Sequence, residues 1–184
     1  YLINNHLTDS QIEELFAPPV PERDEISYST AYDCDIVVDK YDNLHIAVVI
    51  APTGTIPYSI ITAEGFFAAY NLITADGGAS WYCREMGRLR TFRGTFGDLT
   101  DDNRIQLTIN NEGNVTFTTW LDTDLEEEED NNRPNIWCRG NDVENDCKTW
   151  NPYGDYAPTN VTELSDAMWQ AYFYLAPKYC FIPE

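Results

Sequence analysis

The chain has 184 residues, of which 43% are apolar, enough to bury the core of one large domain or two small ones. Its 31 acidic residues against 11 basic ones give a formal charge of −20, which would repel nucleic acid and an anionic membrane surface. Apolar stretches such as residues 46–52 are far shorter than the roughly 20 residues of a membrane-spanning helix. We therefore expect neither a nucleic-acid partner nor a membrane span.

A short helix is predicted near the start, over residues 7–16. Thr8 and Gln11 fit a capping box, and one helical face is apolar, with Ile12, Leu15 and Phe16. Residues 17–21, Ala-Pro-Pro-Val-Pro, cannot continue a helix and are expected to form an extended linker. We assign residues 1–25 to this helix and linker, outside the sheets.

An internal repeat follows the linker. Residues 35–49 and 106–120 each predict two strands joined by a polar turn, and they align without a gap. This alignment places Asp39 on Asn110, Asn43 on Asn114 and Val49 on Trp120.

Each hairpin precedes a second pair of predicted strands. These are residues 58–62 with 74–81, and 135–139 with 143–150, with loops at 51–57, 64–72 and 122–134. Aromatic residues beside Thr, Val and Ile, in runs bounded by turn residues, also favour an all-β class. Four antiparallel strands per unit are typical of β-propeller blades, so residues 26–184 predict about two and a half blades of an incomplete ring. Further chain or another subunit would supply the rest.

One motif is specific. Residues 74–81, Thr-Ala-Asp-Gly-Gly-Ala-Ser-Trp, match the Asp-box pattern at every defined position, namely Thr74, Asp76, Gly78, Ser80 and Trp81. In this the chain resembles sialidase-like β-propeller proteins with Asp-box (BNR) repeats. The resemblance implies a structural turn between the third and fourth strands of a blade, in which the carboxylate accepts backbone hydrogen bonds, a glycine adopts positive φ and the Trp packs between sheets.

A degraded second copy keeps Thr149 and Trp150 but has Asn145 and Cys147 at the Asp and Gly positions. We predict that Trp150 occupies the place of Trp81 in the next blade.

Other segments are similar to sialidase-like proteins exported by the type IX secretion pathway: residues 42–46, 101–106, 119–124 and 134–140. The resemblance implies a secreted or cell-surface protein. It would be a non-catalytic module that binds carbohydrate or protein. The alternatives are a sialidase-type glycoside hydrolase and a subunit of a surface or secretion assembly. The absence of an initiating Met and of a signal-peptide pattern suggests a mature product or a fragment.

No catalytic residues are assigned. Sialidases of this family use an arginine triad, a Tyr nucleophile backed by Glu, and an Asp acid/base. Arg93 stands where the Arg-Ile-Pro signature would be, but Gly94-Thr95 replaces Ile-Pro. Five other arginines are expected to pair with the abundant carboxylates, namely Arg88, Arg90, Arg104, Arg133 and Arg139. His6 and His45 have no evident partners in the sequence.

Calcium is the single cofactor that the sequence suggests. Residues 122–132 begin like a calcium loop, with Asp122 and Asp124 as predicted ligands; the alternative is a solvated acidic loop. The five cysteines are too scattered for a zinc site. Cys138 and Cys147 lie across a predicted hairpin, as a disulfide or as buried free thiols.

Overall fold

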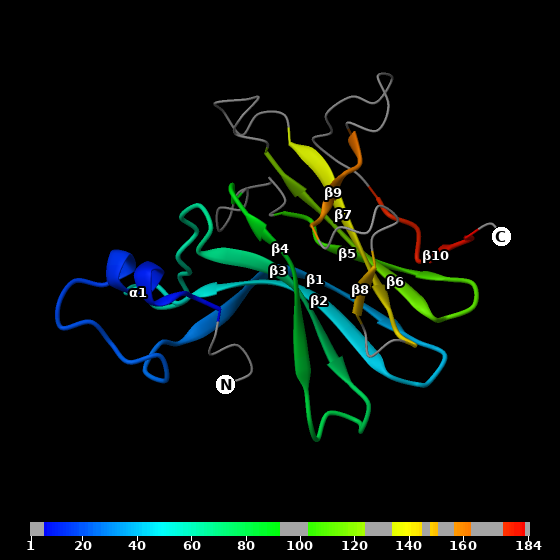
Figure 1. Ribbon diagram of the computed structural model, residues 1–184, viewed down its shortest axis with the longest axis horizontal. Coiled ribbons are helices and arrows are strands. Elements are labelled where there is room, and N and C mark those ends of the chain that lie inside the picture. The colour runs from blue at the N-terminus through cyan, green and yellow to red at the C-terminus, as the bar shows by residue number, and fades with distance from the viewer. Residues whose placement is uncertain are drawn as a thin grey trace.

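The computed structural model describes residues 6–92, 103–123, 134–144, 148–150, 157–162 and 175–182. A helix, α1 (Asp9–Leu15), precedes the strands (Figure 1). The strands are β1 (Tyr28–Val38), β2 (Leu44–Pro52), β3 (Phe67–Thr74), β4 (Tyr82–Leu89), β5 (Gln106–Asn110), β6 (Val115–Asp122), β7 (Asn135–Asp142), β8 (Lys148–Trp150), β9 (Thr159–Asn160) and β10 (Tyr179–Cys180). The all-β class with one short helix is confirmed for these residues.

The strands form two sheets. The first is an antiparallel meander in the order β1-β2-β3-β4, and the second repeats it with β5-β6-β7-β8. Strand β10 adds to β5 in parallel, and β9 pairs with the outer part of β7. The predicted units of four antiparallel strands are thus confirmed. In the described residues neither sheet closes into a barrel, which is consistent with blades of an incomplete propeller.

The main core lies between the two sheets. Val37, Val49 and Phe67 of the first sheet belong to the same buried cluster as Leu107 and Trp120 of the second. Because a single four-stranded sheet cannot bury this face by itself, each sheet buries it by packing on its neighbour.

The two hairpin turns begin in the same way. Asp39 Oδ1 accepts a hydrogen bond from the Asn43 N–H (3.0 Å), and Asn110 Oδ1 accepts one from the Asn114 N–H (3.0 Å). The residue before each of these donors has positive φ, 63° at Asp42 and 73° at Gly113. The predicted matches of Asp39 with Asn110 and of Asn43 with Asn114 are confirmed.

The third match, Val49 with Trp120, is wrong. In the first hairpin Val38 pairs with Leu44 across residues 39–43, whereas in the second Ile109 pairs with Thr116 across residues 110–115. The extra residue shifts the register by one, which turns the following side chains to the other face of the sheet. Trp120 therefore corresponds to Val48.

The third strand of the first sheet is also misplaced in the sequence prediction. Residues 58–62 form no strand and contribute only an isolated bridge from Ile60 to Thr53, while β3 occupies most of the predicted loop 64–72. Strand β3 is buried on both faces, so its side chains show no alternation of apolar and polar types. In the second sheet, residues 135–139 lie in β7 as predicted.

The N-terminal segment lies at one end of the first sheet, outside the sheets, as predicted (Figure 1). The Thr8–Gln11 capping box is present, and Ile12 packs with Leu7 and Phe66 in a small separate cluster. The linker 17–21 is bent at Pro18 and Pro19 instead of being extended throughout, and Pro19 and Pro21 line a cavity together with Phe16. Within the part of the chain described, no helix has the length and apolar character needed to cross a membrane.

Candidate functional site

The turn over residues 74–81 joins β3 to β4, the third and fourth strands of the first sheet, as predicted. Asp76 Oδ1 accepts hydrogen bonds from the Ser80 N–H (2.8 Å) and the Thr74 hydroxyl (2.9 Å), and Oδ2 accepts one from the Ser80 hydroxyl (2.5 Å). These hydrogen bonds, led by that of the Ser80 hydroxyl, lower the pKa of Asp76 to about 2. Gly77 and Gly78 both have positive φ.

Trp81 closes the same turn. Its Nε1 donates to the Gly78 carbonyl (3.0 Å), and its ring lies 3.7 Å from the position of a Cβ on Gly78. The indole is half-buried and covers the turn instead of packing between the sheets, which corrects that expectation. The carboxylate of Asp76 is thus committed to local donors on an exposed turn.

The predicted equivalence of Trp81 and Trp150 is wrong. Trp81 precedes β4, whereas Trp150 lies within β8, opposite Gly140. Eight residues (74–81) separate the last paired residues of β3 and β4, whereas five (143–147) separate those of β7 and β8. The Trp of the motif therefore falls before the fourth strand in the first sheet and within it in the second. Asn145 and Cys147 lie outside the described residues.

A buried polar group that sequence reasoning missed surrounds His45. Its Nε2 lies 3.0 Å from Asp39 Oδ2, and its Nδ1 lies 3.2 Å from the amide nitrogen of Asn71. Because an amide nitrogen can only donate, Nδ1 accepts, and Nε2 carries the proton that Asp39 accepts. Burial raises the pKa of Asp39, but hydrogen bonds from His45, Asn43 and the Tyr41 N–H outweigh it, so the pKa is lowered overall.

His6 also has partners. Its Nε2 lies 2.8 Å from the Phe66 carbonyl, which can only accept, and its Nδ1 lies 2.7 Å from the Tyr70 hydroxyl. Burial lowers the pKa of His6. Both ring nitrogens of each histidine are therefore engaged within the protein. The short sequence distance from Asp39 to His45 was the signal that could have revealed the first of these pairs.

Asp122, one of the two predicted metal ligands, is buried at the end of β6. Its Oδ2 accepts from the Arg90 N–H (2.9 Å), and its Oδ1 accepts from the N–H and hydroxyl of Thr91 (both 2.9 Å) and from the Thr123 N–H (3.0 Å). Burial outweighs these hydrogen bonds and raises the pKa of Asp122 to about 6. The carboxylate thus ties the second sheet to the end of β4.

The second predicted ligand, Asp124, lies outside the described residues. Among the described residues, no group of three or more His, Cys, Asp or Glu side chains is arranged to hold a metal ion. Calcium at Asp122 and Asp124 stays a prediction, and it would have to displace the donors that Asp122 now accepts from. Of the two alternatives for Cys138, the structure has the free thiol, and burial and the Cys180 thiol raise its pKa to about 12.

A cleft of about 340 Å³ opens where the two sheets meet, beside Asp122. Its apolar wall contains Trp120 and Trp137, which are directly paired across β6 and β7 and so point to the same face. Trp120 is only 1% exposed and forms the floor, while Trp137 is half-buried and donates from Nε1 to the Asp122 carbonyl (3.2 Å). Trp137 is therefore the aromatic surface that a ligand can reach.

Charged groups stand at the mouth of this cleft. Arg90 Nε lies 4.0 Å from Glu64 Oε1, a loose pair whose side chains are 39% and 62% exposed. Arg88, which also lines the cleft, is held by Glu85 (Nε to Oε1 3.0 Å) and by the Gly65 carbonyl (3.2 Å). An aromatic wall with a donor and an acceptor beside it can bind a molecule with an apolar ring face and hydroxyl groups.

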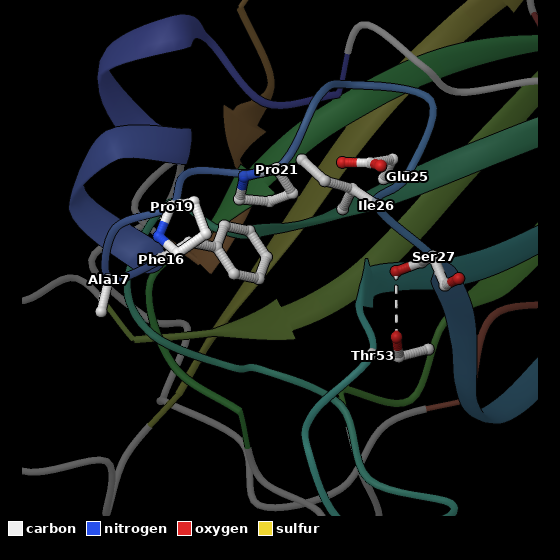
Figure 2. Close-up of a pocket in the computed structure, with 8 residues that line it drawn as sticks. All are labelled: Phe16, Ala17, Pro19, Pro21, Glu25, Ile26, Ser27 and Thr53. Atoms are coloured by element: carbon white, nitrogen blue, oxygen red, sulfur yellow. Dashed lines mark hydrogen bonds between the residues drawn. The ribbon is translucent and has the colours of Figure 1, made fainter.

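A second cavity of about 340 Å³ lies under the N-terminal linker (Figure 2). The rings of Phe16, Pro19 and Pro21 line one side, and the hydrogen bond from the Thr53 hydroxyl to the Ser27 carbonyl (3.2 Å) closes another. Its one charged lining group, Glu25, accepts from the Glu22 N–H (2.9 Å). With few polar groups converging on it, this cavity is a weaker candidate than the cleft between the sheets.

The residue considered for the arginine signature, Arg93, lies outside the described residues. In the described part of the chain, two of the arginines that were expected to pair with carboxylates do so, Arg88 with Glu85 and Arg90 with Glu64. Tyr70 contacts Glu85 (3.1 Å), but it is buried, and burial raises its pKa, which opposes a role as a nucleophile.

The chain matches no family model, no curated protein and no solved structure.

Proposed function

We propose that the chain is a non-catalytic β-propeller module that binds a carbohydrate in the cleft between its two sheets. The observation that carries this proposal is the half-buried Trp137 ring beside the exposed Arg90–Glu64 pair. The apolar face of a sugar ring packs on an indole, while its hydroxyls need a donor and an acceptor close by. The net charge of −20 favours a neutral sugar over a polyanionic one.

The binding role is preferred to catalysis because of Asp122. It is the carboxylate most deeply placed in the cleft, and both its oxygens accept hydrogen bonds from protein donors. A general acid or base must instead reach a reacting atom. The resemblance to exported sialidase-like proteins supports a secreted or cell-surface location for such a module.

A glycan screen followed by titration calorimetry on the best hit tests the proposal. Arg90→Gln and Glu64→Gln should each weaken binding about tenfold, which is the loss of one charge-assisted hydrogen bond. The matched control is Glu13→Gln, an exposed glutamate on α1, which should bind like the parent chain. If all three variants bound the glycan with the same affinity, the cleft would not be the binding site. If Arg90→Gln and Glu64→Gln instead abolished binding of a protein, the ligand of the cleft would be a protein and not a sugar.

The alternative of a sialidase-type hydrolase is tested on fluorogenic glycosides. Turnover that is lost in Arg93→Ala would establish the enzyme and overturn the non-catalytic proposal. The third alternative, a subunit of a surface assembly, would appear as stable partners that copurify with the chain and are unaffected by Arg90→Gln.

A further inference from the structure

The N-terminal segment, residues 6–16, is attached to residues that line the cleft between the sheets. Gln11 Nε2 donates a hydrogen bond to the Gly65 carbonyl (3.1 Å), and Arg88 Nη1 donates to the same carbonyl (3.2 Å). Arg88 also donates from Nη2 to the His6 carbonyl. Because Gly65 and Arg88 both line the cleft, the segment helps to hold this part of its rim in place.

His6 fastens the start of the segment to the first sheet. The side chain is 2% exposed, with Nδ1 2.7 Å from the Tyr70 hydroxyl on β3 and Nε2 2.8 Å from the Phe66 carbonyl just before β3. The acidic residues of the segment are exposed instead, namely Asp9, Glu13 and Glu14. A charge on His6 would therefore be buried, unlike the charges of these carboxylates.

The hydrogen bonds around His6 depend on its protonation state. In the neutral ring Nε2 carries the proton, because the Phe66 carbonyl can only accept, so Nδ1 accepts from the Tyr70 hydroxyl. That hydroxyl has one proton, and Glu85 Oε2, 3.1 Å away, competes for it. In the protonated ring Nδ1 becomes a donor to Tyr70, which then gives its own proton to Glu85. Protonation of His6 therefore reverses the hydrogen bond that joins the segment to β3.

The surroundings of His6 oppose a positive charge. Burial has the largest effect and lowers the pKa of His6; the hydrogen bond to the Phe66 carbonyl raises it, Arg88 lowers it and Glu85 raises it, and the net result is a lowered pKa. Arg88 Nη1 lies 3.3 Å from Nε2 and, as a donor only, gains no hydrogen bond from a nitrogen that carries a proton. The titratable and charged side chains that face His6 or its neighbour Leu7 are Tyr28, Tyr70, Glu85, Arg88 and Arg23.

We propose that His6 is a pH-sensitive latch, which fastens the N-terminal segment at neutral pH and releases it in acid, so that Arg88 and the rim of the cleft at Gly65 lose its support. A protonated His6 has to hold its charge in a buried position beside the Arg88 guanidinium, whereas water solvates the charge in the released segment. Because the folded-state pKa lies below the ordinary 6.5, docking is strongest above pH 6.5 and weakens as the pH falls below it.

Hydrogen exchange of α1 tests the release directly. The Ile12 N–H donates to the Thr8 carbonyl (3.0 Å), and the Phe16 N–H donates to the Ile12 carbonyl (3.1 Å). Since an isolated helix of this length is unstable in water, protection of these two amides reports docking of the segment. Between pH 7 and pH 5 their protection factors should fall at least ~3-fold more in the parent chain than in His6→Gln, which stays neutral at residue 6.

The matched control is Glu13→Gln, which removes an exposed titratable group from the same helix and should respond to pH as the parent does. An NMR titration of the His6 ring in the full parent chain is a second measurement, and it decides the question if His6→Gln does not dock at pH 7. The expected midpoint lies below 6.5. A ring that titrates at or above 6.5 would overturn the latch, and so would equal pH dependence of protection in the parent and a docked His6→Gln.

The effect of the latch on ligand binding rests on the proposed function, and its test keeps the two apart. From pH 7 to pH 5 the affinity for the best glycan should fall at least ~3-fold more in the parent than in His6→Gln. Asp122, which titrates beside the cleft, is present in both proteins and therefore does not contribute to the difference. Identical pH dependence would overturn the link between the segment and the cleft. If no glycan binds, the proposed function fails, while the exchange and NMR results still decide the latch.

Discussion

Trp120 in the second sheet lies directly against Gly87 in the first: a Cβ on Gly87 would come within 2.6 Å of Cζ2 and 3.0 Å of Cη2 of the indole. Beside it, Arg139 Nη1 donates to the Met86 carbonyl (3.0 Å) and the Glu85 carbonyl (3.3 Å). The missing side chain at residue 87 therefore lets the two sheets approach and places Trp120 in the floor of the cleft.

Gly87→Ala should lower the free energy of unfolding by about 1–3 kcal/mol, because the methyl group overpacks the contact with a rigid ring. Urea denaturation measures the loss. The double variant Gly87→Ala with Trp120→Phe is the control: a smaller ring leaves room, so its loss should be less than the sum of the two single losses. Strictly additive losses would contradict direct contact between the two residues.

Gly113→Ala should cost more than Gly77→Ala, although both glycines have nearly the same positive φ, 73° and 71°. A Cβ at Gly77 meets no atom within 4 Å, so that variant reports only the backbone strain, about 1–2 kcal/mol. A Cβ at Gly113 would lie 3.0 Å from both N and Cβ of Lys40 and would push apart the two hairpin turns. Equal losses in urea denaturation would show that the turn-to-turn contact adds nothing.

Asp76→Ala should lower the melting temperature and leave ligand affinity unchanged, because the carboxylate serves only the 74–81 turn. The folded-state pKa of about 2 lies below the ordinary 3.8, so the stabilisation is complete above pH 3.8 and is lost as the pH falls through 2. Calorimetry between pH 7 and 2 should show the two proteins converge at low pH. Lost binding at an unchanged melting temperature would reverse the assignment.

Asp122 should make stability depend on pH in the opposite direction. Because burial raises its folded-state pKa from 3.8 to about 6, the folded chain binds more protons than the unfolded one between these values, and stability rises as the pH falls through them. The stability of the parent chain relative to Asp122→Asn should therefore increase by about 3 kcal/mol from pH 7 to pH 4. A difference that stays constant across this range would contradict the raised pKa of the carboxyl group.

The sequence by itself determined the local features, because each depends on residues within a few positions of one another. The Thr8–Gln11 capping box, the turn around Asp76 and the matched turns at Asp39 and Asn110 were all readable from such short patterns. Short runs of aromatic and β-branched residues likewise determined the all-β class.

Only the tertiary structure decided the features that depend on distant residues. Strand β3 looked like a loop because burial on both faces removes the alternation that marks a strand. Because the second hairpin turn is one residue longer than the first, Trp120 lies on the face of its sheet that corresponds to Val48 and not to Val49. Packing between the sheets brought Trp137, Arg90 and Glu64 to one cleft. Residues so far apart in the chain meet through sheet packing, which leaves no mark in any short stretch of sequence.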